Sequence, residues 1–161
     1  MVRRATFSRV PGFRPHVEVS SDPARLDRNR VHRFLSRESY WAIGVSREDV
    51  DRAIDGSVAF GLYVEGVQVG FARAVTDGAT FAWIADLFVL ADHRGQGLGR
   101  CLLEVVLAHP DVRGARNVLL ATADAHGLYR SYGFRPLVEP DRYLNLRGQR
   151  ERPFAPAPPD D

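Results

Sequence analysis

The segment from Asp86 to Arg100 constrains the fold more than any other part of the chain. It begins with an apolar run, passes through a turn rich in Gly and polar residues, and continues from Leu98 with apolar residues at helical spacing. This order predicts a strand, a tight turn and the start of a helix. The first N–H groups of a helix have no partner within it, so such a turn is typical of a phosphate-binding site.

The spacing of the glycines excludes two common phosphate ligands. Dinucleotide folds use G-x-G-x-x-G, but here Gly95 and Gly97 are followed by Arg100, and Gly97 and Gly99 by Leu102. A triphosphate-binding loop needs Lys after its last Gly, and the sequence contains no Lys. The turn reads Arg-x-x-Gly-x-Gly from position 94, and its glycines allow close approach of a ligand to the backbone.

A second informative segment covers residues 117–136. Its pattern predicts a buried strand, a turn and a short helix that ends at Gly133, where a left-handed residue is favoured. The helix and its end read Ala-x-x-Leu-Tyr-x-x-x-Gly-Phe, from Ala125 to Phe134. The second segment follows the first by about 25 residues.

Together the two motifs resemble those of the GCN5-related N-acetyltransferases, the GNAT family. That family carries R/Q-x-x-G-x-G/A as its acetyl-CoA signature and A-x-x-L-Y-x-x-x-G-F after a later strand, and the resemblance spans residues 17 to 146. It implies a single-domain acyl-CoA N-acyltransferase fold with a central mixed β-sheet flanked by helices. One position departs from the pattern, because Thr122 stands where the family often has Asn.

The periodicity of the chain fits a mixed α/β domain. An antiparallel hairpin is expected early, with Glu65-Gly66 as its two-residue turn, and a βαβ unit late. Strands are expected at residues 16–20, 58–64, 67–75, 80–89, near 118 and at 142–146. Helices are expected at residues 23–37, 47–54, 97–108 and around Tyr129.

Composition sets the expected domain boundaries and location. We expect a flexible Arg-rich arm over residues 1–15, the catalytic domain over 16–148, and a Pro-rich flexible tail over 149–161. The sequence shows neither an apolar run of membrane-spanning length nor the apolar core of a secretory signal. Cys101 is the single cysteine, so no disulfide forms within the chain, and a cytoplasmic protein without a membrane partner is expected.

The charge distribution disfavours a nucleic-acid partner. The net charge is +2, but four of the 22 basic residues lie in residues 1–16, which contain no acid. The remainder therefore has 18 basic and 20 acidic residues, so the domain itself is not basic.

The resemblance implies acetyl-CoA as the acetyl donor, held largely by backbone groups. A backbone N–H near the end of the central strand would also polarise the thioester carbonyl. No His or Cys spacing indicates a metal site, and none is expected. The residues expected to bind the donor are Leu87, Phe88, Val89, Arg94, Gly95, Gln96, Gly97, Leu98, Gly99 and Arg100.

Two residues are candidates for catalysis. Tyr129 is expected to protonate the departing thiolate, since a phenol with a pKa of about 10 can supply a proton to a thiolate whose acid has a pKa of about 8.5. A core aromatic that joins helix to sheet is the alternative. Asp86 is expected as the general base or as an amine-binding group, because burying a carboxylate between apolar strand residues costs free energy unless it faces a site or has a partner. A structural hydrogen-bond acceptor is the alternative.

On the acceptor side, the link between the first two helices contains Tyr40 and Trp41, which would receive an apolar or aromatic part of a small amine. A role in capping the core is equally compatible with the sequence. Asp124, at the end of the late strand, is a further candidate.

The sequence therefore predicts an acetyl-CoA-dependent N-acetyltransferase, a monomer or homodimer, that transfers the acetyl group directly to the primary amine of a small molecule. Two alternatives stay open. One is a CoA-binding sensor or regulatory domain without turnover, and the other is an acetyltransferase that acts on protein N-termini or aminoacyl-tRNA.

Overall fold

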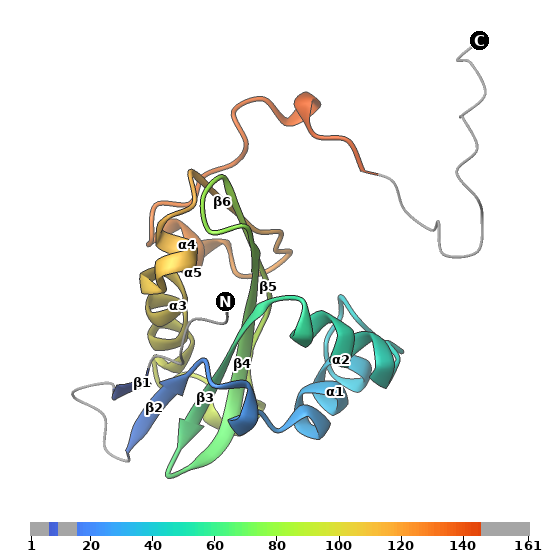
Figure 1. Ribbon diagram of the computed structural model, residues 1–161, viewed down its shortest axis with the longest axis vertical. Helices are drawn as coiled ribbons and strands as arrows, with labels where there is room; N and C mark the ends of the chain where they lie inside the picture. The colour runs from blue at the N-terminus through green and yellow to red at the C-terminus, as the bar shows by residue number, and fades with distance from the viewer. Residues whose placement is uncertain (1–6, 10–15, 146–161) are drawn as a thin grey trace. The chain divides into compact units, whose positions relative to one another are not determined.

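A computed structural model describes residues 7–9 and 16–145, and the chain divides into two compact units, Met1–Ala123 and Asp124–Asp161. The first unit contains a six-stranded sheet in the order β1-β2-β3-β4-β5-β6 (Figure 1). Neighbouring strands are antiparallel except β5 and β6, which are parallel. The strands are β1 (Phe7–Arg9), β2 (Val17–Ser20), β3 (Val58–Val64), β4 (Val67–Thr76), β5 (Phe81–Val89) and β6 (Asn117–Leu119).

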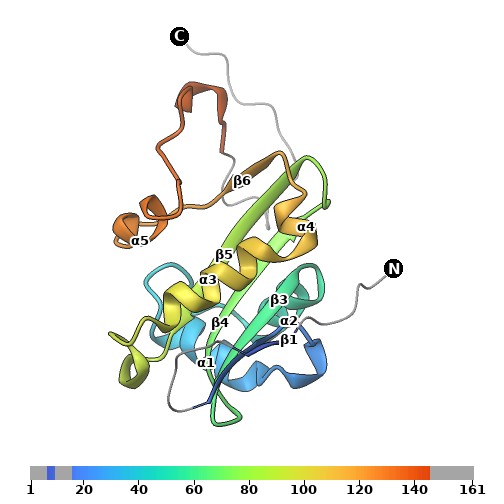
Figure 2. The same ribbon diagram turned by 90° about the vertical axis from the view of Figure 1, so that its left-hand side faces the viewer.

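Four helices cover the two faces of this sheet. Helices α1 (Arg28–Arg37) and α2 (Arg47–Asp55) lie on one face, and α3 (Leu98–Ala108) and α4 (Pro110–Arg113) lie on the other (Figures 1 and 2). The parallel β5–β6 pair is joined through α3 and α4, as a βαβ unit requires. The predicted mixed sheet with flanking helices is confirmed.

Local chemistry accounts for several of the predicted boundaries. The Ser46 hydroxyl accepts a hydrogen bond from the Asp49 N–H at 3.1 Å and so begins α2. Glu65 and Gly66 join β3 to β4 with φ values of 48° and 79°, the two left-handed residues of a type I′ hairpin turn. On α3 the buried residues are Leu98, Cys101, Leu102, Leu103 and Val106, close to the predicted apolar stripe.

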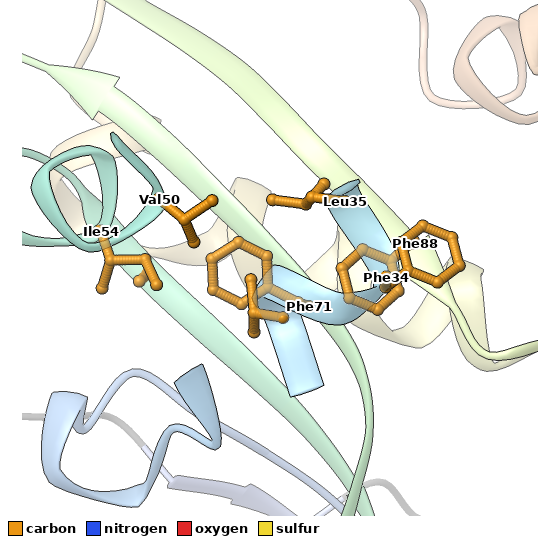
Figure 3. Close-up of a cluster of buried hydrophobic side chains, with 8 residues drawn as sticks. Phe34, Leu35, Val50, Ile54, Phe71 and Phe88 are labelled. Carbon is orange, nitrogen blue, oxygen red and sulfur yellow. The ribbon is translucent and has the colours of Figure 1, made fainter. Parts of the chain in front are cut away.

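An apolar cluster joins α1 and α2 to the sheet (Figure 3). Phe34 of α1 stacks on Phe88 of β5, with ring centroids 3.8 Å apart and planes 12° apart. The ring of Phe71 of β4 lies on from that of Phe88, and the two ring centroids are 6.0 Å apart. The buried members of the cluster are Val31, Phe34, Leu35, Val50, Ile54, Ala59, Phe71 and Phe88.

The prediction of a single helix over residues 23–37 is wrong. It is divided into a short 3₁₀ turn, η1 (Pro23–Arg25), and α1. Asp27 interrupts it, because its side chain accepts from the Arg30 N–H at 2.9 Å and caps a new helix. The Asp27 N–H meanwhile donates to the Gln68 side-chain oxygen at 2.7 Å, which ties the break to β4.

Three further elements differ from expectation. Strand β6 is short, and its residues are exposed or half-buried rather than buried. Residues 142–145 form no strand, because Arg142 ends a 3₁₀ turn, η3 (Pro140–Arg142), and residues 143–145 have no regular structure; Leu146 lies outside the described residues. Strand β1 was not predicted and falls within the expected arm, where it pairs antiparallel with β2.

The expected domain boundaries stay predictions. The proposed tail, residues 149–161, lies outside the described residues, as does most of the proposed arm. In the described parts of the chain, no helix has both the length and the apolar character needed to cross a membrane.

Phe34→Ala should lower the free energy of unfolding by about 3–5 kcal/mol, because it removes a buried ring and leaves a cavity against Phe88. Chemical denaturation measures this effect. The control is Arg33→Ala, an exposed neighbour on α1, which should change stability by less than about 0.5 kcal/mol. Equal losses in the two variants would contradict the assigned packing.

Candidate active site

The turn between β5 and α3 has the geometry of an anion-binding helix start. A 3₁₀ turn, η2 (Ala91–His93), follows β5, and Gly95 and Gly97 then adopt φ values of 74° and 78°. Gly97 is the N-cap of α3, and no side chain caps this helix. The N–H groups of Leu98 and Gly99, at the start of α3, have no acceptor within the helix, and such groups are typical of an anion site.

Arg94 supports the turn from within. Its Nε–H donates to the carbonyl oxygen of Val89 at 2.8 Å, which fixes the turn to the end of β5. This contact gives the first residue of the Arg-x-x-Gly-x-Gly motif a structural role that the sequence did not reveal. A contact between the same guanidinium and a phosphate stays a prediction.

The surroundings of Gly99 leave room for a side chain. A Cβ at this position would meet only the Val89 Cγ2 atom, at 3.9 Å, which is ordinary van der Waals contact. Packing of the protein thus does not require glycine here. A glycine in the first turn of α3 instead keeps the helix start open to close approach.

A β-bulge interrupts β5 just before this turn. Asp86 and Leu87 lie together opposite the single residue Ala72 of β4, and Asp86 adopts a φ of 55°. Pairing between β5 and β6 ends at Trp83, whereas β5 continues to Val89. In the described chain, the bulge and the residues after it thus extend beyond the end of β6.

The backbone groups after the bulge can be oriented from one hydrogen bond. The Leu90 N–H donates to the Val69 carbonyl oxygen of β4 at 2.8 Å. Backbone groups alternate along a strand, so those of Val89 and Leu87 point away from β4, toward the side where β6 has ended. Phe88 contributes its ring to the core, and its expected contact with the donor stays a prediction.

The carboxylate of Asp86 has a partner at each oxygen. Oδ1 accepts from the Trp41 indole Nε1–H at 2.9 Å, and Oδ2 accepts from the Arg73 Nε–H at 2.5 Å. The side chains of Arg73 and Asp86 are 19% and 13% exposed. The structure thus brings together two predicted site residues, Asp86 and Trp41, from segments far apart in the sequence.

Tyr40 and Trp41 lie in the link between α1 and α2, which we call the aromatic loop (residues 39–45). Their rings meet edge to face at 4.9 Å, and both residues remain exposed, at 56% and 43%. The Tyr40 hydroxyl oxygen accepts from the Ala123 N–H at 3.0 Å. The loop is therefore held at its polar atoms while both rings remain partly exposed.

The remaining predicted residues belong to the second unit. Tyr129 lies in α5 (His126–Arg130), with its ring edge to face against Phe134 at 5.8 Å. Gly133 has a φ of 89°, and the Phe134 N–H returns to the Tyr129 carbonyl oxygen at 3.2 Å. This explains the L-Y-x-x-x-G-F spacing as one local fold. Asp124 is exposed just before the helix.

Cys101 does not have the properties of a nucleophile. It is 7% exposed on the buried side of α3, and burial raises the pKa of its thiol. In the described parts of the chain, no three His, Cys, Asp or Glu side chains gather as a metal site would require.

Sequence reasoning missed Arg73. It is a single charged residue within the apolar run of β4, just as Asp86 is in β5. Two lone opposite charges in adjacent predicted strands are a signal of a cross-strand pair, and here that signal was present.

Comparison with known proteins decides the family. Residues 55–136 match the model described as the acetyltransferase (GNAT) domain. This chain belongs to the GNAT family. The match contains the bulge, the Gly-rich turn, α3 and the Tyr129 motif.

Solved structures agree with this assignment. A GNAT-family structure from Xanthomonas campestris pv. campestris is 48% identical in sequence to this chain. The match covers 83% of this chain and 94% of the Xanthomonas chain, with a TM-score of 0.80. A GNAT acetyltransferase from Brucella melitensis, solved with acetyl-CoA, is 21% identical, covers 74% and 83% of the two chains, and has a TM-score of 0.60. The latter likeness concerns the fold alone.

One relative carries a specific name. Serotonin N-acetyltransferase 2, chloroplastic, of Oryza sativa subsp. japonica is 35% identical over 88 residues, which are 54% of this chain and 43% of the rice protein.

Proposed function

We propose that this GNAT protein is an acetyl-CoA-dependent N-acetyltransferase that transfers the acetyl group directly to a primary amine. The observation that carries the proposal is the uncapped start of α3, which follows the open edge of β5 after the turn at residues 90–97. A phosphate site and an extended hydrogen-bonding edge are thereby joined, as a ligand with a pyrophosphate and a long amide-containing arm requires.

The donor is proposed to bind mainly through the backbone. Its pyrophosphate would accept from the first N–H groups of α3, at Leu98 and Gly99. Its amide-containing arm would pair with the backbone groups of Leu87 and Val89. An N–H of this strand edge would donate to the thioester carbonyl oxygen and stabilise the charge that develops there. Gly95 and Gln96 complete the turn around the phosphates.

Chemistry then needs little from the chain beyond proton transfer. A neutral amine attacks the thioester carbon, a C–N bond forms, the C–S bond breaks, and the thiolate leaves. The amine loses one proton to a base, and the thiolate gains one from an acid, for which we propose the Tyr129 hydroxyl. Transfer is proposed to be direct, because the single cysteine is buried and the pKa of its thiol is raised.

The acceptor is proposed to be a small primary amine with an aromatic or other flat apolar group. The exposed rings of Tyr40 and Trp41 supply a surface for such a group. The name of the rice relative, a serotonin N-acetyltransferase, supports an aromatic amine as the first class to test. Asp124 is proposed as a further contact for the amine.

Gly99→Ala should separate binding from folding. We expect the free energy of unfolding to stay unchanged or to rise by up to about 1 kcal/mol, because alanine favours a helix and fits beside Val89. The Kd for CoA should rise at least about tenfold, which corresponds to about 1.4 kcal/mol, because the methyl group blocks the helix start.

Calorimetric titration and denaturation measure the two effects of Gly99→Ala. Glu104→Ala, on an exposed position of the same helix, is the control and should leave CoA affinity unchanged. A parallel loss of stability and affinity in Gly99→Ala would show that the glycine serves packing instead.

Tyr129→Phe should lower kcat by about 100-fold or more, because it removes the proposed acid, while the Kd for CoA changes little. Release of CoA from acetyl-CoA, measured over a panel of arylalkylamines and other primary amines, gives the rates. Tyr132→Phe is the matched control.

Equal losses of turnover and CoA affinity in Tyr129→Phe would assign Tyr129 to packing. Tight CoA binding by the unaltered protein without turnover over the whole panel would favour the sensor alternative.

A further inference from the structure

Both carboxylate oxygens of Asp86 are engaged by hydrogen-bond donors of the protein, which favours a structural role over that of a general base. An ionised carboxylate only accepts hydrogen bonds, and here one oxygen accepts from an indole N–H and the other from a guanidinium. The positive charge of Arg73, 2.5 Å away, also opposes the approach of an ammonium group to the same carboxylate. The geometry instead makes Asp86 a connection between β4, β5 and the aromatic loop.

The aromatic loop is ordered by its own hydrogen bonds. The buried Ser39 hydroxyl donates to the Leu35 carbonyl oxygen at 2.7 Å and accepts from the Ala42 N–H at 3.1 Å. The Gly44 N–H donates to the Ser36 carbonyl oxygen at 2.9 Å. The backbone of the loop is thus fixed close to α1, which leaves the Trp41 ring to be oriented by its own contacts.

Three contacts orient that ring, and the first is its edge-to-face contact with Tyr40 at 4.9 Å. The indole N–H is held by Asp86, and the ring centroid lies 6.3 Å from that of Phe34, which is itself stacked on Phe88 of β5. Trp41 nevertheless remains 43% exposed. A ring fixed at its polar edge and backed by the core presents a flat, preorganised surface, which lowers the entropic cost of binding.

We propose that Asp86 is a positioning residue. Its carboxylate, held by Arg73, fixes the Trp41 ring as one wall of the acceptor subsite, and it does not take the proton of the amine. The subsite accepts the flat apolar or aromatic part of a primary amine by ring contact. This role rests on the proposed acetyl transfer, and it replaces the general-base assignment for Asp86 with one that both of its hydrogen bonds support.

The backbone at Asp86 allows a clean substitution. Its φ of 55° lies in the left-handed region, which glycine adopts without strain and asparagine tolerates. Asp86→Gly therefore removes the carboxylate and preserves the bulge. A β-branched residue would also remove the carboxylate, but it would strain the left-handed backbone and disturb the bulge. Asp86→Asn keeps one acceptor oxygen and loses the charge, so it serves as the conservative variant.

The first measurement is independent of turnover. The chain has two tryptophans, so in a Trp83→Phe background the fluorescence reports Trp41 alone. Adding Asp86→Gly should raise acrylamide quenching and lower the anisotropy of Trp41, and Asp86→Asn should give an intermediate result. Unchanged quenching and anisotropy in both variants would overturn the proposal.

The second measurement is steady-state kinetics with an arylalkylamine found in the acceptor panel. In Asp86→Gly we expect KM for the amine to rise about tenfold, kcat to change less than about threefold, and the acidic limb of the kcat profile against pH to persist. In a Trp41→Phe background, the same substitution should have little further effect on KM, because the shared contact is already lost.

If Asp86 were the general base, the kinetics of Asp86→Gly would differ from those expected for a positioning residue. A fall in kcat of about 100-fold or more with loss of the acidic limb would overturn the positioning role and leave acetyl transfer intact. If the unaltered protein acetylates no amine, the proposed function fails, and Trp41 fluorescence still decides whether Asp86 holds the ring.

Discussion

The bulge at Asp86 and Leu87 is the constraint on which the rest of the site depends. One extra residue in β5 bends the strand. Because β6 pairs with β5 only as far as Trp83, the later backbone groups of β5 lie on an open edge. The same residue that makes the bulge, in a left-handed conformation, sends its carboxylate to Arg73 and Trp41. A single local distortion thus shapes both the proposed donor edge and the proposed acceptor wall.

The donor half and the acceptor half of the proposed site depend on different parts of the chain, the backbone in one and the side chains in the other. The donor half depends on backbone groups, namely the strand edge and the uncapped start of α3, so it tolerates varied side chains but requires glycines at particular places. The acceptor half depends on side chains, and its order comes from an aromatic series that runs from Phe71 through Phe88 and Phe34 to Trp41. Packing in the core thereby extends to the exposed surface that is proposed to bind the acceptor.

This difference explains how much the sequence could predict. The turn at residues 94–100 and the Tyr129 segment have fixed spacing because backbone geometry demands it, and both motifs were predictable from the residues alone. The Asp86–Arg73–Trp41 contacts were not, since they join three segments that no local pattern relates. The break at Asp27 was missed for a similar reason, because the Asp27 N–H bonds a side chain of β4. The short β6 and the absence of a strand at 142–145 show that apolar patterning alone does not define strand length.

Hydrogen–deuterium exchange with and without acetyl-CoA tests the central claim most directly, since the donor site is proposed to consist of backbone N–H groups. The account predicts that saturating acetyl-CoA slows exchange at residues 87–89 and 97–100, with little change in α2. Unchanged exchange in both segments at saturation, or protection found only elsewhere in the chain, would contradict it.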